Sequence, residues 1–185
     1  MINCTSTATT AHLVFDGCDI GGTATNFAFI VTGSPSTTFR FFGNYIHDHA
    51  VGFLSLSTVG VSSHVISRNI ISDNVRGIHV TATTGGGVQR LDIINNTFAN
   101  NTTSAIETDY TTGRSAIITL NNNILYGSAA LIDNATAGYD ASWDGRNNAF
   151  GGGGAITNYT TDLGRITLTG DPFTNAASDD YSLDN

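Results

Sequence analysis

The chain has 185 residues, which is enough length for one domain with a sizeable core. Its formal net charge is −8. It contains no lysine and a single glutamate, while Thr, Ile, Asn and Gly are abundant, so the composition predicts an all-β chain rich in turns. The acidic balance argues against nucleic acid as a partner and disfavours polyanionic glycans, because like charges repel. No stretch has the length of a membrane span, so membrane insertion is not expected.

A repeated pattern of about 25 residues organises the sequence. In the unit around Asn69, His64 and Ile66 lie five and three residues before the asparagine, and Ile71 lies two after it. The same offsets fit anchor residues spaced by 26, 25, 27, 27, 25 and 23 positions, namely Cys18, Asn44, Asn69, Asn96, Asn123, Asn148 and Asp171. Such a period indicates about seven stacked structural units.

Each unit predicts three short strands: one before the anchor, one directly after it, and a third such as residues 77–80. Strands of this kind can stack in parallel as the coils of a solenoid, about 4.8 Å apart. The residues two positions after each anchor are then expected to form an internal stack, namely Ile20, Ile46, Ile71, Phe98, Leu125, Phe150 and Phe173. The anchor asparagines are expected to form a column of amides that bond one another and the turn backbone.

Two other architectures fit part of the pattern. A leucine-rich repeat has apolar residues at the same offsets, but leucine is a minority here and the return segments lack helix-forming runs. A threonine-rich ice-binding solenoid needs a regular outward array of threonines, which the sequence does not contain. We therefore assign residues 1–185 to a single solenoid domain, with clear coils over 13–173 and edge segments at 1–12 and 174–185. Cys4 and Cys18 do not define a disulfide framework, and their redox state stays open.

The Asn-x-Ile/Phe turns, followed by strands of the type Gly-Ile-His-Val, resemble the repeats of the pectate-lyase-like superfamily over residues 13 to about 173. The closing stretch GDPFTNAASDDYSLDN is similar to the ending of bacterial surface β-helix proteins. The resemblance implies a single-stranded, right-handed parallel β-helix of about seven coils with three short strands per coil. It also implies an extracellular or cell-surface location, although the first residues do not form a secretory signal.

In enzymes of this superfamily the substrate groove follows the outer face of the third strand and the loop before it. At those positions Arg76, His79 and Glu107 are the candidate catalytic residues, because neighbouring coils place His79 beside Glu107 and an arginine could hold an anion. Candidate substrate-binding residues are His47, His49, Asp73, Asp109, Tyr110 and Asp133. A solvated strand face carries the same residue types, so a purely structural role is the alternative for all of them.

Two functional hypotheses follow. The first is an extracellular module that binds or processes a polysaccharide, and any catalysis would be that of a polysaccharide lyase or glycoside hydrolase. The catalytic patterns of polygalacturonases and pectate lyases are not found at the corresponding positions, so binding is favoured over turnover. The second is a non-catalytic stalk or adhesin segment of a larger bacterial surface protein. No cofactor or metal is predicted, since no motif supports calcium, and the unpaired strand edges at the coil ends favour end-to-end self-association.

Overall fold

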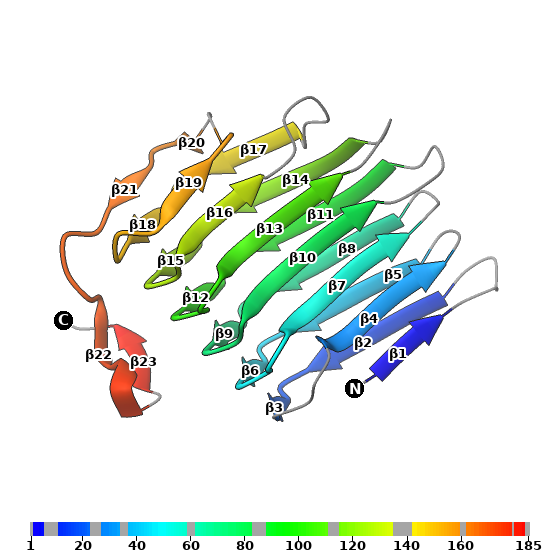
Figure 1. The fold of residues 1–185 in the computed structure, drawn as a ribbon, viewed down its shortest axis with the longest axis horizontal. Coiled ribbons are helices and arrows are strands. Elements are labelled where there is room, and N and C mark those ends of the chain that lie inside the picture. Colours follow the sequence, from blue (N-terminus) through cyan, green and yellow to red (C-terminus); the bar gives the residue numbers. More distant parts are fainter. Residues whose placement is uncertain are drawn as a thin grey trace.

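The computed structural model describes residues 2–5, 11–22, 27–33, 37–58, 62–82, 88–110, 115–134, 142–159, 162–178 and 180–183. In these ranges the regular structure is β apart from one short 3-10 turn, η1 (Ala176–Ser178). Three parallel sheets have seven strands each, and the chain visits them in turn (Figure 1). Each coil therefore contributes one strand to every sheet.

Sheet A contains β1 (Ile2–Thr5), β4 (Phe27–Gly33), β7 (Gly52–Thr58), β10 (Arg76–Ala82), β13 (Ser104–Tyr110), β16 (Ala130–Asn134) and β19 (Ala155–Thr157). Sheet B contains β2 (Ala11–Asp16), β5 (Thr37–Phe42), β8 (Ser62–Ser67), β11 (Val88–Ile94), β14 (Ser115–Asn121), β17 (Ser142–Arg146) and β20 (Asp162–Leu163). Sheet C contains the short strands β3 (Asp19–Gly21), β6 (Tyr45–His47), β9 (Ile70–Ser72), β12 (Thr97–Ala99), β15 (Ile124–Tyr126), β18 (Ala149–Gly151) and β21 (Ile166–Thr167).

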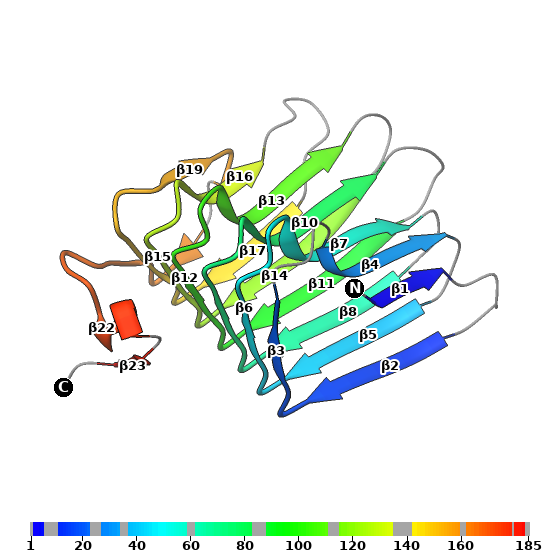
Figure 2. The same cartoon turned by 60° about the horizontal axis from the view of Figure 1, so that its bottom comes forward.

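This arrangement is a parallel β-helix with three strands per coil, so the predicted fold class is confirmed. Figure 2 shows the coils lying over one another, with the short strands of sheet C at one side of the stack. Parallel strands need a connection that leaves the sheet and returns, and here the other two strands of each coil provide that connection.

The interior consists of stacked apolar side chains in the predicted register. Ile46, Ile71, Phe98 and Leu125 occupy equivalent places in sheet C and are fully buried, and Phe150 follows Leu125 in the next coil. Burying such a side chain contributes roughly 1.5–3 kcal/mol. The stacks therefore stabilise the packing of one coil on the next.

His64 occupies one of these interior positions in sheet B, between Phe39 and Leu91 of the neighbouring coils. Its side chain is almost completely buried, and neither ring nitrogen has a hydrogen-bond partner in the described residues. The offset from Asn69 predicts an inward residue at His64, either hydrogen-bonded or lying at the edge of the core, rather than a ligand. The structure places it inside the core without a hydrogen bond in the described residues. Burial lowers the pKa of His64 to about 4.

The prediction for the last coil is wrong. Ile166 and Thr167 pair with Ala149 and Phe150 in sheet C, so Thr167 rather than Phe173 follows Phe150, and Asp171 is not an anchor. The seventh coil is shorter than the others, with two residues in each of its strands in sheets B and C. The apolar residues around Asp171 have the spacing of the repeat by coincidence, because the coils end with β21, before this residue.

Beyond the last coil the chain forms an antiparallel hairpin, β22 (Phe173–Asn175) and β23 (Asp180–Leu183). Phe173 and Tyr181 are buried in a small cluster against the outer face of sheet C, where Phe173 meets Tyr126 edge to face at 5.9 Å. The Tyr181 hydroxyl donates a hydrogen bond to Asp73. The hairpin therefore folds back along the coils rather than extending them.

A ladder of buried asparagines occupies the turn between sheets B and C, which we call the first corner. The first ladder consists of Asn44, Asn69, Asn96, Asn123 and Asn148, each at most 2% exposed. Each Oδ1 from Asn69 onward accepts both the backbone N–H and the side-chain N–H of the asparagine in the preceding coil, at 2.9–3.1 Å. The predicted column of asparagines is therefore present.

The ladder is closed differently at its two ends. At the first coil, the Cys18 backbone N–H donates to Asn44 Oδ1 at 2.9 Å, and Cys18 itself is a free thiol. At the other end, Asn148 Nδ2 donates to the Asp162 carboxylate at 2.9 Å, and Asp162 also accepts the Tyr159 hydroxyl. Tyr159 packs edge to face on Trp143, so an aromatic ring and a carboxylate close the ladder at Asn148.

A second, shorter ladder occupies the turn between sheets C and A, the second corner. The second ladder consists of Asn74 and Asn101, with His49 and Ser128 in the equivalent places one coil before and after. Asn74 Nδ2 donates to Asn101 Oδ1 at 3.2 Å, and the His49 backbone N–H donates to Asn74 Oδ1 at 3.1 Å. The Ser128 hydroxyl is buried without a partner in the described residues, so the ladder ends there.

Both corners are tight because the residue before each ladder position has a left-handed backbone. In the first corner φ lies between 54° and 62° at Gly17, Gly43, Arg68, Asn95, Asn122 and Asn147. Gly and Asn tolerate this conformation at little cost, whereas it is unfavourable for arginine. Arg68 is therefore a strained position in an otherwise well-matched corner.

Candidate functional site

The three candidate catalytic residues lie together on the outer face of sheet A. Arg76 and His79 belong to β10, and the parallel register pairs His79 directly with Glu107 of β13. Arg76 Nε donates to Glu107 Oε2 at 2.8 Å, and Ser104 Oγ donates to the same oxygen at 2.9 Å. His79 Nε2 lies 3.4 Å from Glu107 Oε1, an ion-pair distance without the geometry of a hydrogen bond. The carboxylate is thus held by two hydrogen bonds, with the His79 ring beside it.

This cluster is partly shielded from solvent. The side chains of Glu107 and His79 are 14% and 17% exposed. The ring of Phe27 lies 5.8 Å from the ring of His79 with the two planes nearly parallel. It reaches there across Gly52, where a Cβ would lie 2.5 Å from the Phe27 ring, so glycine is needed to let the aromatic ring pass. The site therefore combines a fixed polar group with an apolar side wall.

The protonation of His79 and Asp133 follows from this environment. Burial lowers the pKa of His79, the charges of Glu107 and Asp109 oppose this, and Arg76 adds to it, so the imidazole is neutral at pH 7. Asp133 of β16 pairs with Glu107 in the next coil. Burial and the charges of Glu107 and Asp109 raise the pKa of Asp133. Carboxylates that are spread over separate coils in the sequence thus lie side by side on the sheet. The Tyr110 side chain lies outside the described part of the structure.

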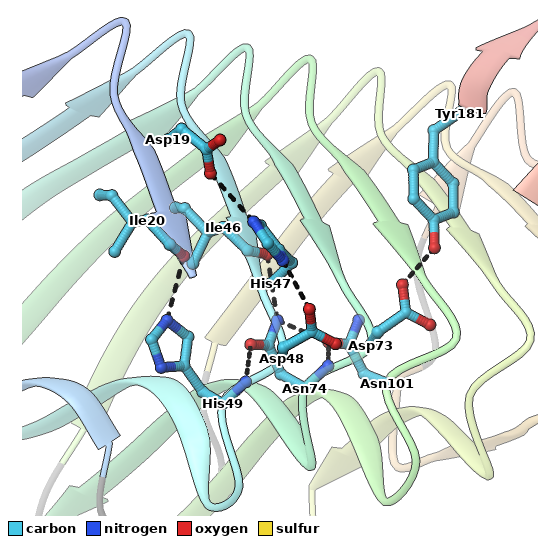
Figure 3. A network of polar contacts seen from close by, with 10 residues as sticks. All are labelled: Asp19, Ile20, Ile46, His47, Asp48, His49, Asp73, Asn74, Asn101 and Tyr181. Carbon is cyan, nitrogen blue, oxygen red and sulfur yellow. Dashed lines mark hydrogen bonds and ion pairs between the residues drawn. The ribbon is translucent and has the colours of Figure 1, made fainter. Parts of the chain in front are cut away.

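His47 belongs to a different face, the outer side of sheet C (Figure 3). Its ring stacks on Tyr45 at 4.2 Å, and its two nitrogens contact Asp48 Oδ2 at 2.7 Å and Asp19 Oδ1 at 2.9 Å. Burial lowers the pKa of His47, but the hydrogen bonds and charges of Asp48 and Asp19 outweigh it and raise the pKa above its ordinary value. This imidazole is therefore held between two carboxylates, and both nitrogens are occupied.

His49 and Asp73 have structural surroundings. His49 is buried, and its Nε2 contacts the backbone oxygen of Ile20 at 3.1 Å. Burial is the main reason that its pKa is lowered. Asp73 accepts the hydroxyl of Tyr181 from the C-terminal hairpin, as Figure 3 shows. The predicted site residues therefore separate into a cluster on sheet A and residues around sheet C, rather than lining one groove.

The chemistry available at these places is that of hydrogen bonding and ion pairing. No group of three or more His, Cys, Asp or Glu side chains is arranged to hold a metal ion within the described ranges. In the same residues, no helix has the length and apolarity needed to cross a bilayer.

One surface feature was not predicted from the sequence. A groove on the outer face of sheet B is lined by His12, Leu13, Val14, Thr38, Arg40 and Ser63. Strand alternation alone shows that the polar members point outward, so the signal was present in the sequence. What the sequence does not show is whether their polar atoms already have partners.

The comparisons with other proteins add no family assignment. No family model matches the chain, and no curated protein or solved structure is significantly similar to it. The fold and the surface chemistry therefore carry the functional argument.

Proposed function

We propose that this β-helix is an extracellular or cell-surface module that binds a polysaccharide on the outer face of sheet A. The observation that carries the proposal is the cluster of Arg76, His79 and Glu107, fixed by contacts between adjacent coils at 2.8–3.4 Å. A site whose side chains are already held in place loses little conformational entropy when a ligand binds. The aromatic ring of Phe27 beside His79 provides an apolar surface of the kind on which a sugar ring can pack.

The charges favour a glycan without a high density of anionic groups. Glu107 neutralises Arg76, His79 is neutral at pH 7, and Asp133 adds a carboxyl group on the neighbouring strand. Such a surface offers acceptors and donors to sugar hydroxyls but repels a continuous row of carboxylates. The formal net charge of −8 acts in the same direction.

Binding is favoured over turnover. General acid–base chemistry needs a carboxylate that is free to take a proton from the reacting atoms, or to give one to them. Glu107 Oε2 already accepts two hydrogen bonds from Arg76 and Ser104, so this group orients its neighbours. The same internal pairing supports the second candidate, a passive stalk or adhesin segment, in which these ion pairs only stabilise the stack of coils.

A glycan array probed with labelled protein tests the first candidate, followed by affinity measurement on the best ligand. We expect His79→Ala and Asp133→Asn to weaken binding at least about tenfold, as loss of a hydrogen bond from a partly shielded group does. Asp144→Asn is the matched control, because Asp144 lies on the outer face of sheet B and is 61% exposed. Thermal unfolding of each variant shows that the fold is intact.

The proposal is overturned if the protein binds none of a broad panel of neutral and weakly charged glycans, or if Asp144→Asn loses as much affinity as the site variants. Either result would leave the stalk or adhesin segment as the remaining candidate. Release of reducing sugars by the parent protein, abolished in Asp133→Asn, would show instead that the module is an enzyme.

A further inference from the structure

The groove on the outer face of sheet B is formed by two columns of side chains that cross the first three coils. The register places His12, Thr38 and Ser63 in one column. It places Val14, Arg40 and Val65 in the other, two residues further along each strand. Side chains in a column are about 4.8 Å apart and the columns about 7 Å apart, so Arg40 lies between two valines and beside the column of His12, Thr38 and Ser63. Asp16 and Phe42 follow in the next column along the strands.

Within the described part of the chain, no other side chain or backbone group uses the polar side-chain atoms of this groove. The side chains of His12, Thr38, Arg40 and Ser63 have no hydrogen-bond or ion-pair partner in the described residues. The three chain segments that lead into these strands, 6–10, 34–36 and 59–61, contain no acidic residue in the sequence. Arg40 therefore differs from Arg76, whose guanidinium is held by Glu107.

These groups match an anionic, ring-shaped ligand. A guanidinium binds a carboxylate through two parallel hydrogen bonds, and hydroxyl and imidazole groups beside it complete the recognition of a polar ring. Val14 is 59% exposed and offers an apolar surface next to the charge. The groove encloses about 390 Å³, within the range of small-molecule sites.

We propose that this groove binds a carboxylate-bearing sugar unit, with Arg40 holding the carboxylate. The net charge of −8 disfavours a chain in which every unit is charged, so the expected ligand is an isolated uronic acid within a mostly neutral glycan or at its end. This site is on a different sheet from the Arg76 cluster and does not depend on the proposed function of that cluster.

The test is a titration of the full chain with glucuronic acid, in which binding is detected by changes in the NMR chemical shifts of the backbone amides. Glucose serves as the uncharged counterpart and inorganic sulfate as the anion without a sugar ring. We expect weak binding, on the order of millimolar, with shifts confined to the first three coils. Arg40→Gln should weaken it at least about tenfold, since a charge-assisted pair is lost. Arg146→Gln removes the same charge from the same sheet face, but in β17, and should leave binding unchanged.

Any of these results would overturn the proposal: no binding of glucuronic acid, equal binding of glucose, an Arg40→Gln variant that binds like the parent, or an Arg146→Gln variant that loses as much. Sulfate bound as tightly as glucuronic acid would also overturn it, because the sugar ring would then contribute nothing. His79→Ala and Asp133→Asn should not change this titration, so failure here is separable from failure at sheet A.

Discussion

At both corners of each coil, buried side chains bond the turn backbone, but the ladder of asparagines is longer in the first corner than in the second. Both turns have a left-handed residue followed by a buried ladder position, where an asparagine side chain bonds the backbone of the preceding coil. The first corner does so with five asparagines in succession, whereas the second has Asn74 and Asn101 between His49 and Ser128. The bonds between amides are also longer in the second ladder, 3.2 Å against 2.9–3.1 Å. An amide ladder is thus strong where it is continuous, because every buried donor then finds the acceptor of the next coil.

The largest expected effect comes from removing one asparagine from each ladder. Asn96 takes part in five side-chain hydrogen bonds, and Asn101 in three. Replacement by alanine leaves buried donors and acceptors unpaired at roughly 1–3 kcal/mol each after relaxation. We expect Asn96→Ala to lower the free energy of unfolding by about 4 kcal/mol and Asn101→Ala by about 2 kcal/mol.

Urea titration measures the loss of unfolding free energy in both variants, provided that the slope of this free energy against urea concentration matches that of the parent. Equal losses would contradict the view that continuity of the ladder strengthens the first corner. A larger loss for Asn101→Ala would reverse the comparison altogether.

Acid is expected to destabilise the core through His64 without changing the charge of the two ladders. Amides do not titrate, but burial lowers the pKa of His64 to about 4 from an unfolded value near 6.5. Below pH 6.5 the unfolded chain takes up a proton at this residue that the folded chain does not, so stability is complete above pH 6.5 and falls as the pH drops towards 4. The loss from this residue is about 3 kcal/mol.

His64→Leu should remove that loss and be more stable than the parent at every pH, since it also removes two buried nitrogens that have no partner in the part of the chain that the structure describes. Unfolding of parent and variant between pH 4 and pH 7.5 gives the difference directly, because the other histidines are common to both. A difference that stays constant over this range would show that His64 is not the acid-sensitive group.

These contrasts explain what the sequence could predict. The first ladder recurs in five coils with fixed offsets to apolar residues, so periodicity was sufficient to place it. The second ladder has asparagine in only two coils, five residues after the anchors, which is too short a run to stand out in an Asn-rich chain. The last coil was misplaced because Ile166, Asp171 and Phe173 reproduce the spacing while the short β20 and β21 shift the register.

The surface was predictable only in part. Coil spacing placed His79 beside Glu107, because parallel register is fixed once the anchors are aligned. It could not separate Arg76, which is tied to Glu107, from Arg40, which has no partner in the described residues. That difference depends on contacts between particular side chains, and the repeat of the sequence does not determine these contacts.

Completing the second ladder should stabilise the protein. The Ser128 hydroxyl is buried and has no partner among the described residues, in the position where a third asparagine would accept the N–H groups of Asn101. Ser128→Asn adds these bonds in a place that already excludes water, and we expect a gain of about 1 kcal/mol. Ser128→Ala is the control, because it removes the unpaired hydroxyl without adding a bond. An asparagine variant no more stable than the alanine variant would show that the second corner lacks room for a longer ladder.

The smallest expected effect concerns the strained residue of each corner. Arg68 has φ of 59° in the first corner, and Asp73 has φ of 55° in the second. Glycine adopts this conformation without strain, so Arg68→Gly should raise the free energy of unfolding by about 0.5–1 kcal/mol. Asp73→Gly relieves the same strain but loses the hydrogen bond from Tyr181, so it should bring no gain. Thermal unfolding of the two variants measures this contrast: a gain in Asp73→Gly equal to that in Arg68→Gly would mean that the C-terminal hairpin contributes nothing through Tyr181, and that the corners differ only in their ladders.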